Sequence, residues 1–367
     1  MPPARDTEFL LSQQAIPVTV ALEPVYNVLT SMMLLLHVQE LSGISSWVAD
    51  TAEAMSAAQI YTHRVVLTGL HQALLTERSW ADFPSYLDDM VCQDALVLRD
   101  RLLYTLIHIG TDKQEPALVM TPDKLLGSAE TYLSYLQSAG FEFEEDIERE
   151  AYRWLTNPLG MQKFIVSHLR EIWQEVFALE WKRVKPQLQE SVQSFQQLNL
   201  SGLSTVEAIK IITGRDVSEK WGEMLYSARR IICVPSVHVG PYLWKFHYNG
   251  IVWIIFGARL PEGVQSGSSS LTRSELLVRL DALSDDTRLA ILGLLSQYGE
   301  LHAQDIIERL KLSQSAASRH LRHLSATGYI TERWNDGTKC YSLNRDRIDA
   351  TTQALQQFLS DPHYPAL

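Results

Sequence analysis

Five polar residues near the C-terminal end of the chain fall on one side of a predicted helix. They are Gln314, Ser315, Ser318, Arg319 and Arg322. A glutamine side chain pairs bidentately with adenine, an arginine with guanine, and a serine with a base edge or a phosphate oxygen. Ser313 precedes the helix as its predicted N-cap, and the free N–H groups of a helix N-terminus also bind phosphate. This pattern predicts a surface that contacts nucleic acid.

The opposite side of this helix is apolar. Ala317, Leu321 and Leu324 recur at i, i+4 and i+7, and the helix is expected to end at Gly328. A shorter amphipathic helix comes before it and is joined to it by a turn at residues 311–312. Two short helices connected by a tight turn predict a helix-turn-helix motif.

Two β-strands are predicted to follow, over residues 329–333 and 338–343. The Asn-Asp-Gly sequence at residues 335–337 lies between them and favours a hairpin turn. Such a hairpin forms a wing beside the helix-turn-helix. Basic, aromatic and amide side chains lie at or near its tip, and we expect them to contact DNA too: Arg333, Trp334, Asn335 and Lys339.

Charge is distributed unevenly along the chain. The whole sequence carries a formal net charge of −11, and the first 270 residues account for −10 of it. Between Arg309 and Arg347, eight basic residues stand against three acidic ones, a local excess of +5. A polyanion is attracted to such a local excess, whatever the average charge of the protein.

Together these motifs resemble the ArsR-type (arsenic-repressor-like) winged helix-turn-helix regulators. The resemblance is carried by LDALSDDTRLAILGLL, by LSQSAASRHLRHLSATGYI and by the strand that ends at TKCYSLN, and it covers about Ser274 to Leu359. It implies a transcriptional regulator that binds double-stranded DNA. The first 260 residues resemble an uncharacterised domain that accompanies this winged helix in some bacterial regulators.

The resemblance implies a possible metal site, because many members of the family bind a metal. Their ligands are a cysteine pair on the first helix of the motif, or Asp, His and Glu on the last helix. His302 and Gln304 stand where the paired thiolates would be, and the last helix offers Asp346 and Asp349 without a histidine. These residues do not supply a tetrahedral site. We expect no metal and no other cofactor.

A segment rich in serine and glycine marks the clearest break in composition. It predicts a linker over residues 261–273 between an N-terminal domain, residues 1–260, and a winged helix-turn-helix domain, residues 274–367. The N-terminal domain is predicted to be helical with a small β-sheet at about 230–258. The expected fold class is mainly α with small β-sheets (α+β).

Several individual helix boundaries are also predicted. One helix is expected from Thr121 to Gly140, and a long helix that starts near residue 161 is expected to end or kink near Pro186. Ser284 is the predicted N-cap of the helix that precedes the helix-turn-helix.

The predicted sheet contains an aromatic strand, and Asn249-Gly250 after it favours a hairpin. Alternate residues of this strand form an aromatic face. One interpretation is that this face and two nearby histidines line a pocket for a small-molecule effector: His238, Tyr242, Trp244, Phe246, His247 and Tyr248. The other interpretation is that the aromatic face simply packs on the helices.

Composition and missing motifs exclude several classes. Hydrophobic residues make up 46% and charged residues 20% of the chain, as in globular proteins. Three separated cysteines suggest no disulfide framework, and no apolar run is long enough to span a bilayer, so we expect a cytoplasmic protein without a membrane partner. The sequence contains no nucleophile elbow, P-loop, zincin motif or dinucleotide-binding turn, and we expect no enzymatic activity.

We therefore expect a homodimeric one-component repressor that binds a pseudo-palindromic operator and a small-molecule effector, since two recognition helices related by a dyad suit a two-fold operator. The apolar positions expected to form the dimer are Leu277, Leu280, Leu283, Ile348, Leu355 and Phe358. The alternative is a protein-interaction or scaffold protein whose winged helix does not bind DNA. Binding to DNA that weakens steeply with salt distinguishes the two.

Overall fold

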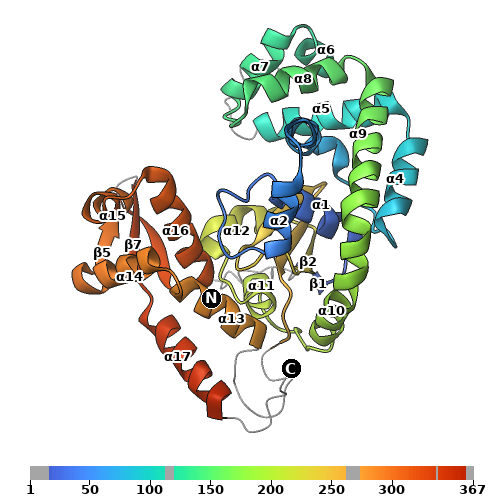
Figure 1. The fold of residues 1–367 in the computed structure, drawn as a ribbon. Coiled ribbons are helices and arrows are strands. Elements are labelled where there is room, and N and C mark those ends of the chain that lie inside the picture. The colour runs from blue at the N-terminus through green and yellow to red at the C-terminus, as the bar shows by residue number, and fades with distance from the viewer. Residues whose placement is uncertain (1–15, 112–119, 262–272, 336–337, 361–367) are drawn as a thin grey trace, which may run out of the picture.

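The computed structural model describes residues 16–111, 120–261, 273–335 and 338–360. Residues 16–261 form a large helical body around a β-sheet, here called the N-terminal part (Figure 1). Residues 273–360 form a smaller unit beside it, here called the C-terminal part. The mixture of many helices with two small sheets confirms the predicted fold class. Most of the predicted linker, residues 262–272, lies outside the described residues.

The sheet of the N-terminal part has the strand order β1-β2-β4-β3. Its strands are β1 (Val18–Val20), β2 (Arg230–Ser236), β3 (Trp244–Tyr248) and β4 (Ile251–Gly257). β3 and β4 form the predicted hairpin, with Tyr248 paired to Ile251 and with positive φ angles of 46° at Asn249 and 71° at Gly250. The first three strands in this order run parallel: the pairing of β1 with β2 is parallel, and so is the pairing of β2 with β4.

Both faces of this sheet are buried. Trp253 and Ile255 of β4 face the larger core, while Val252, Ile254 and Phe256 face a second core on the other side. Near-continuous apolar strands are typical of a parallel sheet covered by helices on both faces. The strand sequences therefore reflect a three-layer arrangement, in which the sheet is the middle layer.

All the helices described in the N-terminal part come before β2 in the chain. They are α1 (Pro24–Leu34), α2 (Ser46–Ala54), α3 (Ala57–Arg64), η1 (Val65–Gly69), η2 (His71–Leu74), α4 (Phe83–Cys92), α5 (Ala95–Thr111), α6 (Pro122–Leu125), α7 (Ala129–Ser138), α8 (Glu145–Leu155), α9 (Pro158–Ile172), η3 (Trp173–Phe177), α10 (Ala178–Gln196), α11 (Thr205–Thr213) and α12 (Ser218–Ser227). None of the described helices is long and apolar enough to cross a membrane.

Two expected features of helices in the N-terminal part, an unbroken helix to Gly140 and a helix end near Pro186, are not found in the structure. The helix expected from Thr121 to Gly140 is divided into α6 and α7, because Ser128 caps a new helix by accepting a hydrogen bond from the Thr131 N–H at 3.1 Å. Pro186 lies inside α10 instead of ending it. Val184 and Leu188 of that helix are buried, and this packing outweighs the cost of about 3 kcal/mol that an interior proline carries.

The C-terminal part consists of five helices and a three-stranded sheet of order β5-β7-β6. Its elements are α13 (Arg273–Leu283), α14 (Asp286–Tyr298), β5 (Glu300–His302), α15 (Ala303–Leu310), α16 (Gln314–Thr327), β6 (Ile330–Asn335), β7 (Thr338–Leu343) and α17 (Arg345–Ser360). Ile291, Leu321 and Tyr329 lie in its core. Ser284 is not the N-cap of α14: Asp285 accepts the hydrogen bond from the Arg288 N–H, because the helix starts one residue later than predicted.

Candidate nucleic-acid interface

Local geometry determines where α16 begins and ends. Ser313 Oγ accepts a hydrogen bond from the Ala316 N–H at 3.2 Å, as predicted for the N-cap. Lys311 turns the chain between α15 and α16 with φ 52°, and Gly328 ends α16 with φ 81°. The buried residues Ala317, Leu321 and Leu324 hold the helix against the C-terminal core. These contacts leave the other side of α16 facing outward.

The outward side of α16 carries the predicted polar residues. Gln314, Ser315, Ser318 and Arg322 are exposed, and Arg319 is half-buried. A groove of about 660 Å³ lies between α15, the first half of α16 and β7. Gln314 and Ser318 line one side of it and Lys339 of β7 lines the other. The fold thus brings residues from the predicted helix and the predicted wing to one concave surface.

The wing is a β6-β7 hairpin, paired from Ile330↔Leu343 to Asn335↔Thr338. Its basic residues form exposed ion pairs: Arg333 with Glu300 at 2.9 Å, and Lys339 with Glu332 at 3.1 Å. Exposed ion pairs of this kind contribute little to the free energy of folding. A DNA phosphate can therefore replace the carboxylate as the partner of the basic side chain. The side chains of Trp334 and Asn335, and residues 336–337, lie outside the described part of the structure.

The second half of α16 contacts the N-terminal part. Nη1 of Arg322 lies 3.4 Å from Oε2 of Glu40 and 3.3 Å from its carbonyl oxygen. Next to it, His323 is fully buried and its Nδ1 lies 2.8 Å from Oγ of Ser42. Burial, assisted by the positive charge of Arg288, lowers the pKa of His323 to about 4. The imidazole is therefore neutral at pH 7, and its approach to Asp281 at 3.8 Å is not an ion pair there.

The amino-acid sequence alone does not indicate this contact. His323 stands nine positions after Gln314, which places the two on opposite sides of the helix. That spacing separates His323 from Gln314, but it does not indicate which distant segment covers it. The covering loop, around Ser42, is more than 280 residues away in the chain.

The aromatic residues proposed as an effector site occupy separate environments. Phe246 and Tyr248 of β3 are buried in the larger core, and Trp244 packs against the same core. The Phe246 ring lies 5.0 Å from Tyr26 and 5.8 Å from His71, centroid to centroid. These contacts show packing of the strand on helices. His247 alternates to the other side of β3 and is exposed.

His238 and Tyr242 lie elsewhere. His238 is buried between Ser31, 2.7 Å from its Nδ1, and Glu180, 2.9 Å from its Nε2. Tyr242 precedes β3, and its hydroxyl donates a hydrogen bond of 2.8 Å to the carbonyl oxygen of Ser42. Tyr242 also lies beside His323, with 6.4 Å between the ring centroids. It therefore belongs to the contact between the two parts of the chain.

Comparison with known proteins matches the C-terminal part. Residues 285–332, which contain Ser313 and the polar face of α16, match the model of the arsR family of bacterial regulatory proteins. The arsenical resistance operon repressor of Staphylococcus xylosus is 39% identical over 85 residues, which make up 23% of this chain and 81% of the repressor. The chain belongs to the arsR family. This arsR-family protein is a DNA-binding transcriptional regulator.

Other relatives agree over the same fraction of the chain. The arsenical resistance operon repressor of Staphylococcus aureus is 38% identical over 85 residues, 23% of this chain and 81% of the relative. The transcriptional activator HlyU of Vibrio cholerae serotype O1 is 33% identical over 84 residues, 23% of this chain and 77% of the relative. The relatives thus include two repressors and one activator.

Metal ligands do not gather in the described residues of this arsR-family protein: no three His, Cys, Asp or Glu side chains among them converge on one point. His302 is exposed and its Nδ1 lies 3.4 Å from Sγ of Cys340. Its backbone N–H donates to Asp305 at 3.0 Å, which is a helix-capping contact.

Proposed function

We propose that the protein is a one-component repressor that reads a pseudo-palindromic operator with α16 and its wing. The observation that carries this proposal is the groove at which Gln314 and Ser318 of α16 face Lys339 of the wing. Gln314, Ser315, Ser318 and Arg319 are assigned to base edges and nearby phosphates, with Ser313 at the helix N-terminus. Arg322 and the wing residues Arg333, Trp334, Asn335 and Lys339 are assigned to the DNA backbone and adjacent groove.

A repressor is proposed because two of the relatives carry that function in their names. Such a protein blocks transcription by occupying its operator. One relative is a transcriptional activator, so expression of a reporter gene is the measurement that decides between repression and activation. Deleting the gene should raise expression from a promoter that contains the selected operator.

Apolar surface on α13 and α17 supports a homodimer. Leu277 is 57% exposed and Leu359 is 73% exposed, although both are leucines. The residues expected to form the dimer around them are half-buried: Leu280, Leu283, Ile348, Leu355 and Phe358. Burial of these side chains against a second copy would place two α16 helices about a dyad, as a pseudo-palindrome requires.

The N-terminal part is proposed to be a separate domain that senses a small molecule. Its loop at Glu40–Ser42 touches α16, so a ligand that moves this loop changes the orientation of the DNA-binding unit. A coupling free energy of about 1–3 kcal/mol is enough for a 5- to 150-fold change in operator affinity.

Selection of bound genomic fragments tests DNA binding and identifies the operator. Gln314→Ala and Arg319→Ala should each reduce discrimination between operator and random DNA by about 1–3 kcal/mol. Lys339→Ala should weaken both DNAs equally and flatten the dependence of affinity on salt. Gln189→Ala and Lys182→Ala, exposed on α10, are the matched controls. Binding that does not weaken with salt, or equal losses on both DNAs for all three variants, contradicts the proposal.

A further inference from the structure

A groove of about 480 Å³ lies along the edge of the N-terminal sheet that β1 forms. β1 and the two residues before it make one wall. The end of α10, the connection over residues 198–203 and the start of α11 make the other wall. Figure 1 shows these elements together at the lower end of the N-terminal part. We call this site the edge groove.

β1 is an edge strand, because it comes first in the sheet order β1-β2-β4-β3. Toward β2, the carbonyl oxygen of Pro17 and the N–H of Ala21 form hydrogen bonds of 3.0 and 3.1 Å. The N–H and C=O groups of successive residues in a strand point to alternate sides. The backbone groups of Val18 and Val20 therefore point away from β2, toward the open side of the sheet.

Most of these outward groups lack a partner. Nε2 of Gln196 donates to the carbonyl oxygen of Val20 at 3.0 Å. No other described residue hydrogen-bonds to this edge, so the N–H and C=O of Val18 and the N–H of Val20 stay unpaired within the described part of the chain. An unpaired strand edge is a template for pairing with another strand.

The walls of the groove are uncharged and largely apolar. Leu198, Leu200 and Leu203 are half-buried, which leaves apolar surface that a ligand can cover. None of the described residues that line the groove is Asp, Glu, Lys or Arg, so a charge placed there would find no counter-charge among them. The groove therefore suits an uncharged, apolar ligand, and its volume is within the roughly 300–1,000 Å³ typical of ligand sites.

The open edge also indicates the chemistry of that ligand. An amino-acid residue in extended conformation presents its N–H and its C=O to the same side, whereas the two groups of a single trans amide point to opposite sides. Pairing with both groups of Val18 therefore requires a residue inside a peptide and not an isolated amide. Addition of a strand to a sheet edge is a general mode of peptide recognition, in which main-chain hydrogen bonds provide affinity.

We propose that the edge groove binds an extended, apolar peptide segment that pairs with Val18 as a further strand of the sheet. One residue of the peptide accepts a hydrogen bond from the Val18 N–H and donates one to the Val18 carbonyl oxygen. Its apolar side chains pack on the three leucines of the opposite wall, and charged peptide termini lie outside the groove.

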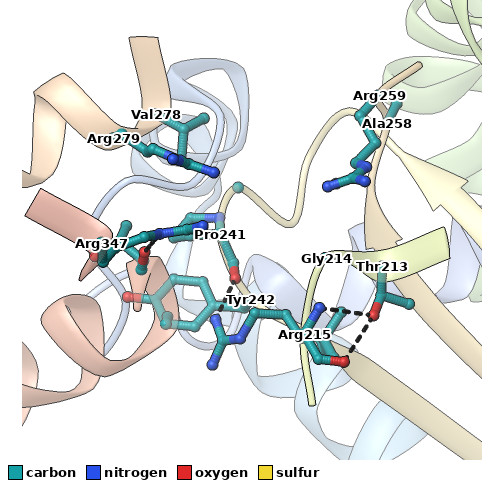
Figure 2. Close-up of a pocket in the computed structure, with 15 residues that line it drawn as sticks. Thr213, Gly214, Arg215, Pro241, Tyr242, Ala258, Arg259, Val278, Arg279 and Arg347 are labelled. Carbon is teal, nitrogen blue, oxygen red and sulfur yellow. Dashed lines mark hydrogen bonds between the residues drawn. The ribbon is translucent and has the colours of Figure 1, made fainter. Parts of the chain in front are cut away.

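α11 connects the edge groove with the C-terminal part. The start of this helix lines the groove, and Thr213 at its end lines a second, small pocket together with Gly214 and Arg215 (Figure 2). Arg347 of α17 lines that pocket from the C-terminal part. A peptide that shifts α11 therefore changes the boundary between the two parts. For its effect on DNA this inference rests on the proposed function, and it names the ligand class for the proposed sensor.

Peptide binding is measured on the full chain in the absence of DNA. The probes are tripeptides built from leucine, valine and phenylalanine, with an acetylated N-terminus and an amidated C-terminus so that they carry no charge. Isothermal titration should show saturable binding of at least one tripeptide with a Kd below about 1 mM, and the same tripeptide should raise Tm. A wild type that binds none of them overturns the proposal.

A matched ligand separates strand pairing from apolar burial alone. In the ester analogue of the bound tripeptide, an oxygen replaces the N–H of the central residue, so the Val18 carbonyl oxygen receives no hydrogen bond. The analogue should bind about three- to tenfold more weakly than the tripeptide. Equal affinity of the two ligands contradicts pairing with the strand edge.

Variants connect the binding to the groove. Val18→Pro removes the outward N–H, which an edge strand tolerates, and should weaken tripeptide affinity about three- to tenfold. Leu200→Glu places a charge in the apolar wall and should weaken it about tenfold or more. Leu179→Glu, at a 79% exposed leucine of α10, is the control and should bind like the wild type. Circular dichroism confirms folding, and Leu200→Glu decides should Val18→Pro unfold. A Leu200→Glu variant that binds like this control refutes the site.

The outcomes are separable from those of the proposed function. Operator binding by the same wild-type preparation is measured independently, with and without the tripeptide. Intact operator binding without tripeptide binding rejects only this inference, whereas tripeptide binding without operator binding rejects only the proposed DNA-binding role. A bound tripeptide that leaves operator affinity unchanged rejects the link through α11.

Discussion

Oγ of Ser42 and Nδ1 of His323 are 2.8 Å apart, and this hydrogen bond joins the N-terminal part of the chain to the middle of α16. The Tyr242 hydroxyl donates to the carbonyl oxygen of the same Ser42, so the loop is held from two directions. One turn of α16 is thus fixed to the N-terminal part, while Gln314 and Ser318 at its start stay exposed. The helix that is proposed to read DNA is also the helix that the rest of the protein contacts.

The pair between Glu40 and Arg322 should compete with DNA. Both side chains are about half exposed, at 55% and 45%, and such a pair contributes roughly 0.2–1 kcal/mol. Glu40→Gln releases Arg322 to a phosphate and should raise operator affinity about 1.5- to 5-fold, measured by fluorescence anisotropy at low salt. Glu53→Gln, an exposed change on α2, should leave affinity unchanged. Weaker operator binding by Glu40→Gln than by this control contradicts the competition.

The buried pair of His63 and His168 should make the protein sensitive to acid. Nδ1 of His63 lies 2.8 Å from Nε2 of His168, and the other nitrogen of His63 donates to the carbonyl oxygen of Met32. This arrangement requires neutral imidazoles, and burial lowers the pKa of each from 6.5 to about 4. Because the unfolded chain then binds more protons, the free energy of unfolding should fall as the pH drops from 6.5 towards 4.

Urea denaturation measures that loss at several pH values. Each of the two histidines contributes a slope of up to about 1.4 kcal/mol per pH unit in this window. His168→Gln keeps an N–H donor for Nδ1 of His63 but does not titrate, so its slope should be smaller by about that amount. Gln189→Ala, an exposed change on α10 that alters no titratable group, should keep the wild-type slope. A wild-type slope in His168→Gln would refute the assignment.

Close packing of Gly240 should make it intolerant of a side chain. Its φ is 56°, and an added Cβ would collide with the backbone carbonyl of Gly43 in the loop that contacts α16. Gly240→Ala should reduce the free energy of unfolding and break the Ser42–His323 contact. Gly202→Ala is a matched control, because Gly202 also has a positive φ, 85°, with nothing within 4 Å of an added Cβ.

Backbone strain alone costs roughly 1–2 kcal/mol at such positions and should be the whole effect of Gly202→Ala. Gly240→Ala should exceed it by roughly 1–3 kcal/mol, as overpacking does. Thermal denaturation of the two variants provides the comparison. Equal losses would mean that the loop moves aside without cost.

Exposed leucines on α13 and α17 should be needed for self-association. Leu277→Glu and Leu359→Glu place a charge on the proposed dimer surface, and each should raise the dimer dissociation constant at least tenfold in sedimentation velocity. Leu159→Glu changes a comparably exposed leucine of α9, 66% exposed, and should not affect association. A wild type that sediments as a monomer at micromolar concentration would disprove the homodimer.

Local features of the sequence were sufficient to predict several elements. The Ser313 cap, the end of α16 at Gly328 and the hairpin at Asn249-Gly250 follow from the conformational preferences of a few neighbouring residues. The polar and apolar sides of α16 follow from a period of 3.6 residues. These preferences act over a turn or two of chain, so they can be read without knowledge of the fold.

Contacts between distant segments were decided by the tertiary structure. β1 pairs with β2 across more than 200 residues, Pro186 stays inside a helix because its neighbours are buried, and Arg215 and Arg347 line the same small pocket. The polar face of α16 indicated Arg322 as a DNA contact, but only the fold shows Glu40 beside it. The periodicity and capping of a segment specify its own conformation, whereas its partner depends on how all buried surfaces pack together.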